Sequence, residues 1–514
     1  MSTLEVNNKR ILKNTLFLYV RMFFVLLITL FTSRIVLQNL GFEDYGLYNV
    51  VGGLVVFVSF IRNTLTTSTS RYITYEIGNN INNVKNIFAH TFAIHLILAI
   101  LILIIGEILG VIAIHFFMNI PQDRLFACNI VFQLSLTSTA ITILLTPFNS
   151  IIVANEKFNM YAYIGIAEVA LKLIIAYIIS ISPADKMITY SILMFFVTIG
   201  VPIFNVLYVK SKFRSYIYIT SLLDINIIKN MINFTLWGLI GSLANTLKNN
   251  GINILINIFF GATVNAANAI AYQVNAAVNS FTANFTTASN PQITKSYAAG
   301  DYLDMHRLIF LSGKVSFFLL ITLCYPIIFK TDFILSLWLH DYPPYTALFT
   351  RLVLILSLVE TFSFSIGCGV QATGNIKYYQ IVISGITILN FPIAYISYKL
   401  GMPPYSALII SIVISSITLL LRLYFMKVLL NISPREYIQN VFIRCIIVTI
   451  ATYPILYLLS SLFDDSIIGI VLFSFTVVIW NIIVIIIGGL EKKERNYILL
   501  YLKNKINVKS SLRK

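Results

Sequence analysis

Charged residues are scarce in this chain. Only 11% of its 514 residues are Asp, Glu, Lys or Arg, whereas a soluble domain typically has about 25%. Long polar stretches are also missing, because apolar runs recur from residue 11 to residue 490. Together these absences exclude a soluble protein of several domains and indicate a polytopic membrane protein.

Signatures of metal sites and enzymes are missing as well. The cysteines Cys128, Cys324, Cys368 and Cys445 stand singly, and neither a CxxC pair nor a metal-binding Cys/His spacing occurs. The histidines are dispersed, and the longest predicted outer loop, about 330–346, has no DxD motif. The sequence therefore predicts no cofactor, no metal and no enzyme, with a membrane glycosyltransferase or polymerase kept as a less favoured alternative.

The net charge of +16 suggests an acidic partner. However, the basic residues lie in short loops between apolar runs, which favours a membrane surface over nucleic acid. With the N-terminus inside, the inner segments hold 24 of the 36 Lys and Arg residues, the outer loops 5 and the spans 7. Since Lys and Arg mark the cytoplasmic side, we expect both termini in the cytoplasm.

The apolar runs predict about 14 transmembrane helices. A span needs about 20 apolar residues, and backbone groups in hydrocarbon must bond within their own segment. The predicted spans lie at roughly 12–37, 45–70, 87–116, 125–153, 159–181, 187–209, 231–259, 264–289, 307–329, 346–373, 377–399, 404–429, 437–462 and 466–489.

Three pairs of segments recur about 220 residues apart. GFEDYGLYNVV from Gly41 pairs with GATVNAANAIA from Gly261, RYITYEIGNNINNVKNIF from Arg71 pairs with QITKSYAAGDYLDMHRLIF from Gln292, and VANEKFNMY pairs with QATGNIKYY. Each copy holds six predicted helices. An even number gives both copies the same orientation, related by an axis along the membrane normal, with a site between them.

The repeat predicts two pseudo-symmetric six-helix lobes plus two C-terminal helices. The lobes are residues 1–210 and 231–430, joined by a basic amphipathic cytoplasmic linker at 211–230. Residues 431–490 form the two extra helices, and residues 491–514 form a basic cytoplasmic tail.

Ten charged side chains fall inside predicted spans, where each costs about 2.5–3.5 kcal/mol at a helix centre. They are Arg21, Arg34, Arg62, Lys172, Lys248, Lys314, Arg422, Glu107, Glu168 and Glu360. We expect Glu168 and Lys172 to neutralise each other at i,i+4, and Arg422 and Lys314 to reach the inner surface with their long stems.

Arginines beside hydroxyl groups are harder to explain by packing alone. Arg62 shares a helix face with Thr66 and Thr69, and Arg34 follows Thr32 and Ser33. Hydrogen bonds between helices are the alternative for the hydroxyls, but Arg62 favours a water-filled cavity. Arg21 joins the same cavity only if its helix bends, because a straight helix places it more than about 120° from Arg34.

Amide side chains crowd the seventh and eighth predicted spans. Asn245 and Asn253 flank Lys248, and Asn275 belongs to a similar run in the next span. Amides at this density are costly in lipid, so these helices are predicted to face a polar space. The predicted substrate-binding residues are Arg34, Arg62, Lys248, Arg21, Thr66, Thr69, Asn245, Asn253 and Asn275.

The segments LGFEDYGLYNVVGG, TSTSRYITYEIG, NPQITKSYAAGD and QATGNIKYYQ together resemble the polysaccharide flippases of the MOP superfamily, over roughly residues 10–430. The resemblance implies two lobes, alternating access and a cationic central cavity. It also implies translocation of an undecaprenyl-pyrophosphate-linked oligosaccharide, for O-antigen or lipopolysaccharide synthesis, across the bacterial cytoplasmic membrane. A polysaccharide polymerase and a chain-length regulator are the expected protein partners.

The resemblance adds coupling to a Na⁺ or H⁺ gradient as an option, with Glu107 and Glu360 as candidate carboxylates; each is equally open to pairing with a nearby basic residue. A cluster of Arg and Lys in a low dielectric favours an anion such as pyrophosphate. The alternative is a cation-coupled multidrug exporter of the same superfamily, which the basic excess within the spans disfavours.

Overall fold

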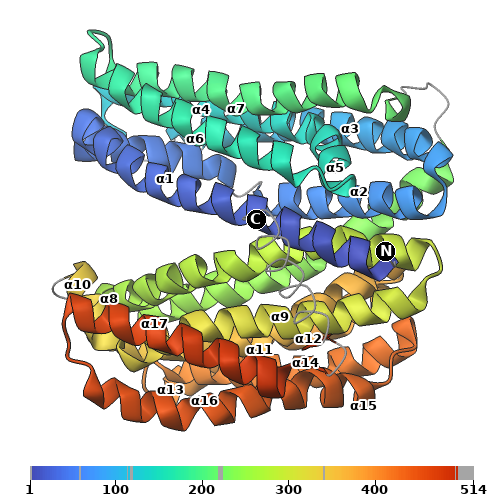
Figure 1. Ribbon diagram of the computed structural model, residues 1–514. Helices are drawn as coiled ribbons and strands as arrows, with labels where there is room; N and C mark the ends of the chain where they lie inside the picture. Colours follow the sequence, from blue (N-terminus) through green and yellow to red (C-terminus); the bar gives the residue numbers. More distant parts are fainter. Residues whose placement is uncertain are drawn as a thin grey trace, which may run out of the picture. The chain divides into compact units, whose positions relative to one another are not determined.

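In the computed structural model every regular element over the described residues is a helix (Figure 1), which confirms the predicted all-α membrane fold. The structure describes residues 3–56, 59–112, 114–115, 120–217, 224–339, 342–491 and 494–495. The helices are α1 (Thr3–Val56), α2 (Ser59–Asn79), α3 (Val84–Ile112), α4 (Leu125–Leu144), α5 (Thr146–Ala154), α6 (Phe158–Ile181), α7 (Lys186–Lys212), α8 (Ile225–Ala298), α9 (Tyr302–Phe329), α10 (Thr331–Leu339), α11 (Thr346–Thr373), α12 (Lys377–Ile388), α13 (Asn390–Lys399), α14 (Ser406–Leu430), α15 (Pro434–Tyr437), α16 (Ile443–Leu462) and α17 (Ile467–Val484).

Among the described residues, 11 helical segments are long and apolar enough to cross a bilayer. The other three predicted spans are also helical. The run 12–37 lies in α1, the run 45–70 crosses α1 and α2, and the run 264–289 lies in α8. The last of these is rich in Asn, which lowers its hydropathy below that of an ordinary span.

The long helices α1 and α8 each turn a corner at one glycine. Gly41 interrupts α1 with φ 77° and ψ 172°, and Gly261 interrupts α8 with φ 81° and ψ 179°. A Cβ at either glycine would have no atom within 4 Å, so crowding does not require glycine there. The positive φ does, because only glycine adopts it without strain. Both corners fall at the start of the first predicted repeat pair.

The described chain divides into two compact units. Unit 1 comprises Met1–Leu243, Thr287–Met305 and Gly374–Ile381, and unit 2 comprises Ala244–Thr286, His306–Thr373 and Val382–Lys514. Unit 1 therefore contains the predicted N-terminal lobe together with three stretches of the predicted second lobe, at 231–243, 287–305 and 374–381. The predicted lobe boundaries at 210 and 231 remain a prediction.

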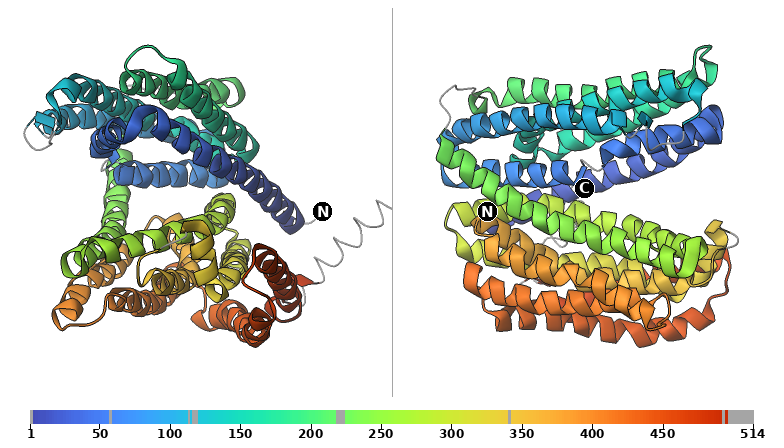
Figure 2. Two further views of the ribbon diagram at one scale, coloured as in Figure 1. Left: turned by 90° about the vertical axis from the view of Figure 1, so that its left-hand side faces the viewer. Right: turned by 180° about the vertical axis from the view of Figure 1, so that it is seen from behind.

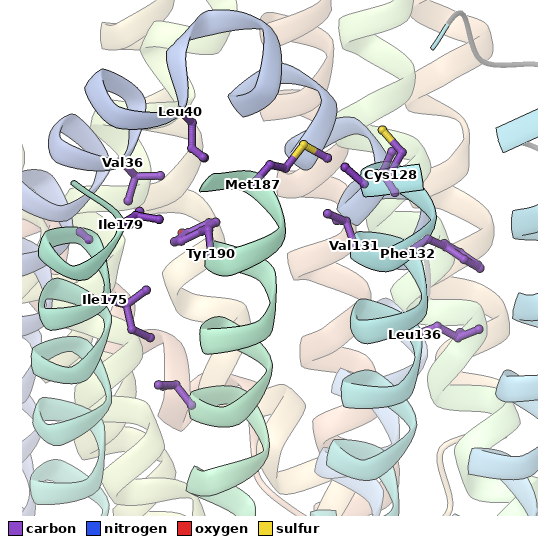
Figure 3. Close-up of a cluster of buried hydrophobic side chains, with 14 of the residues drawn as sticks. Val36, Leu40, Cys128, Val131, Phe132, Leu136, Ile175, Ile179, Met187 and Tyr190 are labelled. Carbon is purple, nitrogen blue, oxygen red and sulfur yellow. The ribbon is translucent and has the colours of Figure 1, made fainter. Parts of the chain in front are cut away.

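Unit 1 is built around a bundle of α1, α3, α4, α6 and α7, which Figure 1 shows running alongside one another. An apolar cluster joins α1, α4, α6 and α7, and Figure 3 shows Val36, Leu40, Ile179 and Tyr190 grouped where α1, α6 and α7 meet. Burial of such aliphatic and aromatic side chains holds these helices together.

Unit 2 packs α11 against α14 and α16 against α17. The α16–α17 pair lies at one edge of the unit, at the red end of the colour scale in Figure 2. Tyr325 of α9 donates a hydrogen bond to the carbonyl of Thr449 at 2.9 Å, and Lys330 bonds Asp465 at 2.7 Å. These bonds attach the two extra helices to the rest of unit 2.

The predicted linker at 211–230 lies partly outside the described residues. In its described part, Phe213, Tyr216 and Ile217 pack on an apolar cluster of unit 1, while Lys212 and Arg214 are exposed. This division matches an amphipathic segment. Asp224 then begins α8, and its backbone N–H donates to His90 Nε2 at 2.8 Å. The tail beyond residue 495 lies outside the described residues.

Candidate functional site

Helices α8, α11 and α14 bring Lys248, Glu360 and Ser415 together inside unit 2. Lys248 Nζ donates to Glu360 Oε1, and Ser415 Oγ donates to the same oxygen at 3.2 Å. Lys248 is only 4% exposed. A buried ammonium group is stable when an opposite charge and hydrogen bonds replace its hydration. The lysine that the sequence assigns to an anion site thus meets its own carboxylate within unit 2.

The bond to Lys248 also affects the predicted role of Glu360 in ion coupling. Its carboxylate already holds one cationic group, so an external cation or proton that binds there has to compete with Lys248. The assignment of Lys248 as a substrate ligand, and of Glu360 as a coupling residue, stays a prediction that requires this pair to open.

A second polar network lies about one helical turn along α11. Asn275 Oδ1 accepts hydrogen bonds from Ser357 Oγ at 2.7 Å and from Asn279 Nδ2 at 3.0 Å. Ser357 and Glu360 are three residues apart and therefore lie on one face of α11. The amide network and the Lys248 pair thus follow one polar face of α11 inside unit 2.

The two arms of α8 meet through another pair of amides. Asn268 Nδ2 donates to Asn253 Oδ1, and beside this pair lies a pocket of about 310 Å³ lined by Asn253, Ile254, Ile258 and Asn265. The Oδ1 atom of Asn265 is buried without a hydrogen bond. Asn245, by contrast, is exposed. The Asn253–Asn268 hydrogen bond therefore joins the two arms of α8.

The hydroxyl groups of α2 point in several directions within unit 1. Thr69 is 2% exposed, and its Oγ1 lies 3.4 Å from His95 Nε2 of α3. Ser68 accepts a hydrogen bond from Thr235 of α8 at 2.8 Å, whereas Thr66 is half-buried and Thr67 is exposed. Thr69 therefore bonds from α2 to α3. This fits the alternative that the hydroxyl groups join helices and do not line a water-filled cavity.

Arg21 packs on α6. Its guanidinium lies 4.7 Å from the centre of the Tyr161 ring, and its Nε approaches Gly165 too closely for any side chain there. The Nε atom is buried without a hydrogen bond. A cation over an aromatic ring within one unit is a helix-packing contact, so the role of Arg21 in a substrate cavity stays a prediction.

Arg34 lies in α1 and Arg62 lies in α2, but their side chains lie outside the described part of the structure. Glu107 is exposed on α3, where it accepts a hydrogen bond from Gln133 Nε2 at 2.7 Å. No basic residue bonds Glu107 in the hydrogen bonds described.

The predictions for Lys172 and for Lys314 have different outcomes. Lys172 bonds Glu168 at 2.6 Å, which confirms that pair. The prediction that Lys314 extends to the membrane surface is wrong, because Lys314 is 1% exposed and bonds Glu494 at 2.6 Å and Glu491 at 3.3 Å. The two glutamates follow α17, so the start of the tail folds back onto α9.

Sequence reasoning missed an ion-pair cluster at the Gly41 corner. Arg124 Nη2 lies 2.6 Å from Asp44 Oδ2, and Arg124 Nη1 lies 2.6 Å from Asp185 Oδ2. Burial alone raises the pKa of the Asp185 carboxyl, but the Ile188 N–H and the Arg124 guanidinium outweigh it and hold that pKa below its usual value. Asp44 lies in α1, Arg124 in the turn before α4, and Asp185 at the start of α7. These segments are far apart in sequence, so only the fold brings them together.

It also missed a buried carboxylate in the loop between α5 and α6. Glu156 Oε1 bonds Lys295 Nζ at 2.6 Å, and Glu156 Oε2 accepts a hydrogen bond from Gln292 Nε2. Here a sequence signal existed, because all three residues lie in the repeat segments. Glu156 and Lys295 lie outside the predicted spans, where a charged side chain is ordinary and does not by itself indicate a buried pair.

No family model and no curated protein sequence matches the chain. The fold nevertheless matches solved membrane transporters. An outward-facing multidrug resistance MATE family transporter of the MOP superfamily superposes with a TM-score of 0.72 at 13% identity, covering 83% of this chain and 96% of that one. A MATE structure in the bent conformation gives 0.71 at 15% identity, with the same coverage of 83% and 96%.

A MOP superfamily transporter from Pyrococcus furiosus gives a TM-score of 0.70 at 14% identity, covering 83% of this chain and 96% of that one. It is described as having a binding pocket of reverse polarity that suggests a different function. At these identities the likeness shows the fold alone. The chain has the two-lobed, polytopic fold of MATE transporters in the MOP superfamily.

Proposed function

We propose that the chain is a transporter that works by alternating access and moves an undecaprenyl-pyrophosphate-linked oligosaccharide from the inner to the outer leaflet of the bacterial cytoplasmic membrane. The fold carries the transport part of the proposal. Repeated bundles with a binding site between them are the usual construction for rocking one bundle against another. The matching corners at Gly41 and Gly261 support that repeat within this chain.

The choice of an anionic substrate rests on the arginines. Lys172, Lys248 and Lys314 each bond a glutamate, so they are weaker candidates for an anion site. The predicted basic substrate ligands that remain are Arg21, Arg34 and Arg62. The planar guanidinium group binds phosphate in a bidentate way and stays charged in a low dielectric, which suits a pyrophosphate head group.

The direction of transport agrees with the membrane potential. Moving a negative head group out of a negative cytoplasm gains about 2.3 kcal/mol per charge per 100 mV. Coupling to Na⁺ or H⁺ through Glu360 would add to this, provided that the cation displaces Lys248. Glu107 is the second candidate, but it lies exposed on α3. We propose further that both termini are cytoplasmic and that a polysaccharide polymerase and a chain-length regulator act on the product.

A multidrug exporter is the second candidate, because two of the similar structures are MATE transporters and one is described as a multidrug resistance transporter. Such a protein would select organic cations and would need carboxylates in its cavity. The superfamily fold tolerates pockets of either sign, as the reverse polarity described for the Pyrococcus furiosus protein illustrates. The arginine excess in the spans favours the anionic substrate.

The test replaces Arg34 and Arg62 singly with alanine and follows surface polysaccharide in a host that lacks its own flippase. We expect each change to reduce surface polysaccharide at least tenfold at equal protein levels. Lys172→Ala is the matched control, since it removes a cation that Glu168 already neutralises, and it should retain most activity.

Two results would contradict the proposal. Full complementation by both arginine variants would exclude the anion site. Drug efflux that depends on Glu360 and Glu107, with no effect on surface polysaccharide, would favour the multidrug exporter instead.

A further inference from the structure

Unit 1 contains the ends of several helices from both halves of the sequence. The carboxyl end of α2 meets both ends of α8 there, and the loops α5–α6 and α11–α12 belong to the same unit. In the predicted topology all of these segments lie on the cytoplasmic side. Their contacts within unit 1 therefore bear on how that side is closed.

The first contact between the two halves centres on Glu156. Its side chain is fully buried, with 0% exposure, and both carboxylate oxygens are engaged. Lys295 Nζ lies 2.6 Å from one oxygen, and Gln292 Nε2 donates to the other. The loop of the first half thereby holds the end of α8 from the second half. We name Glu156, Gln292 and Lys295 the carboxylate clasp.

The second contact reverses this arrangement. Gly374, in the loop α11–α12 of the second half, lies against Arg71 of α2 from the first half. A Cβ on Gly374 would lie 2.6 Å from Arg71 Nη2. The guanidinium also lies 4.9 Å from the ring centre of Tyr75 and 5.3 Å from that of Phe234. We name Arg71, Gly374 and these two rings the arginine clasp.

The backbone supports an equivalence between the two clasps. Glu156 and Gly374 occupy the same position in the repeat pair VANEKFNMY and QATGNIKYY, and both have left-handed backbones, with φ 57° and 77°. A glutamate in this conformation is uncommon. Each loop receives a basic side chain from the other repeat pair, Lys295 from QITKSYAAG and Arg71 from RYITYEIG.

Close helix contacts connect the two clasps. Thr235 of α8 donates a hydrogen bond to Ser68 of α2 at 2.8 Å. The hydroxyl group of Tyr72 in α2 donates to the carbonyl of Asn230 in α8 at 3.2 Å. At the end of α2, a Cβ on Gly78 would lie 2.7 Å from the carbonyl oxygen of Lys295. Opening this end of the molecule therefore has to separate α2 from α8 and break both clasps.

We propose that the carboxylate clasp and the arginine clasp are two pseudo-equivalent latches that hold the cytoplasmic end of the transporter closed, and that both release when it opens inward. The proposal rests on transport by alternating access, but not on the identity of the substrate. An ion pair suits a reversible latch, because separating it exposes two groups that water hydrates well. Separating an equal area of apolar surface has no such compensation.

The test measures access to a cysteine introduced beneath the carboxylate clasp. Ala288 of α8 is fully buried against Leu18 and Phe158 in unit 1. In Ala288→Cys protein in nanodiscs, we expect slow labelling by a polar maleimide. Adding Glu156→Gln or Lys295→Met should accelerate labelling at least fivefold, because either change weakens the latch. The double charge reversal Glu156→Lys with Lys295→Glu should restore slow labelling.

Two controls separate opening from unfolding. Lys157→Met removes an exposed lysine next to Glu156 in the sequence and should leave labelling unchanged. Ala176→Cys reports on the core of unit 1 away from the clasps, and the thiol at this position should stay protected in every variant. Arg71→Gln should also accelerate labelling in the Ala288→Cys background, since the second latch is then weakened. Unchanged labelling at position 288 in the Glu156, Lys295 and Arg71 variants would overturn the proposal.

A disulfide provides the second measurement if a clasp variant also exposes the introduced thiol at position 176. A Cβ at Gly238 would lie 3.0 Å from Thr64 Cγ2, which is within reach of a disulfide between α2 and α8. Thr64→Cys with Gly238→Cys should cross-link readily in the parent and severalfold less in the presence of Glu156→Gln. Equal yields would overturn the proposal. Neither readout uses a glycolipid, so a wrong substrate would leave both intact.

Discussion

The corner at Gly41 in unit 1 and the corner at Gly261 in unit 2 have nearly the same backbone, with φ of 77° and 81° and ψ of 172° and 179°. Their surroundings differ in chemistry. At Gly41, Asp44 and Asp185 hold Arg124 between them, and Tyr48 packs on Tyr190 with ring centres 4.9 Å apart.

At Gly261 the contacts are amide and aromatic. Asn268 bonds Asn253 across the corner, and Phe260 packs edge-on against Tyr398 with ring centres 4.9 Å apart. No ion pair is described among these residues. The comparison teaches that the repeat preserves the path of the chain, which depends on one glycine, while the side chains that fasten each corner have diverged.

The largest expected loss of stability is at the Gly41 corner, where the contacts are ion pairs. Arg124→Met leaves the buried carboxylate of Asp44 without its counterion and should destabilise unit 1 by about 2–3 kcal/mol. The thermal unfolding midpoint of the purified protein in detergent measures this. The exposed Arg214, replaced in the same way, is the control and should change the midpoint little. An equal loss in both variants would mean that the ion pairs of Arg124 do not stabilise unit 1 more than an exposed arginine does.

The two glycines should respond alike. Gly41→Val and Gly261→Val each force a β-branched residue into a left-handed backbone, at a cost of about 2 kcal/mol. Gly200→Ala is the matched control, because its Cβ also has open space but its backbone is helical, and it should be neutral or stabilising. Thermal midpoints that differ strongly between the two valine variants would show that the surroundings, and not the backbone, set the cost.

Removing the amide contact at the Gly261 corner should cost less stability. Asn268→Ala or Asn253→Ala removes one neutral hydrogen bond and should cost about 1 kcal/mol. The double variant should lose less than the sum, because both changes remove the same bond. A double-mutant cycle in thermal unfolding measures the coupling, and strict additivity would contradict a shared bond.

The smallest expected effect is a dependence on pH at the Gly41 corner. The pKa of Asp185 is lower in the folded protein than in the unfolded chain, so its stabilisation is present above the unfolded value of about 3.9 and is lost as the pH falls through the folded value. Because Asp185 is partly exposed, the contribution should stay below about 1 kcal/mol. The thermal midpoints of the parent and Asp185→Asn should converge on acidification. A constant difference down to about pH 3, below the usual carboxyl pKa, would exclude the ion pair as its cause.

Much of the fold was predictable from the sequence, because a lipid bilayer allows few backbone conformations. Apolar runs of span length form helices in a bilayer, and the repeat segments alone place Gly41 and Gly261 at matching points. The i,i+4 pair of Glu168 and Lys172 was predictable for the same reason, since a single helix fixes its geometry.

The partners of the other charges were not predictable. Lys248 bonds Glu360, which is 112 positions away in the sequence, and Lys314 bonds Glu494, which is 180 positions away. Nothing in the local sequence of Lys314 distinguishes a buried pair from a side chain that extends to the membrane surface. Thr69 was equally ambiguous, because a helix face of hydroxyl groups fits water or a neighbouring histidine.

The sequence by itself determined that this is an all-helical membrane protein with an internal repeat, because hydropathy, glycine and helix periodicity act over a few residues. The tertiary structure alone decided which charges on different segments neutralise one another, and it joined Glu156 to Lys295 and Arg71 to the Gly374 loop. Those pairings depend on distances of a few ångströms between segments far apart in the chain, and electrostatic partners are selected by such distances.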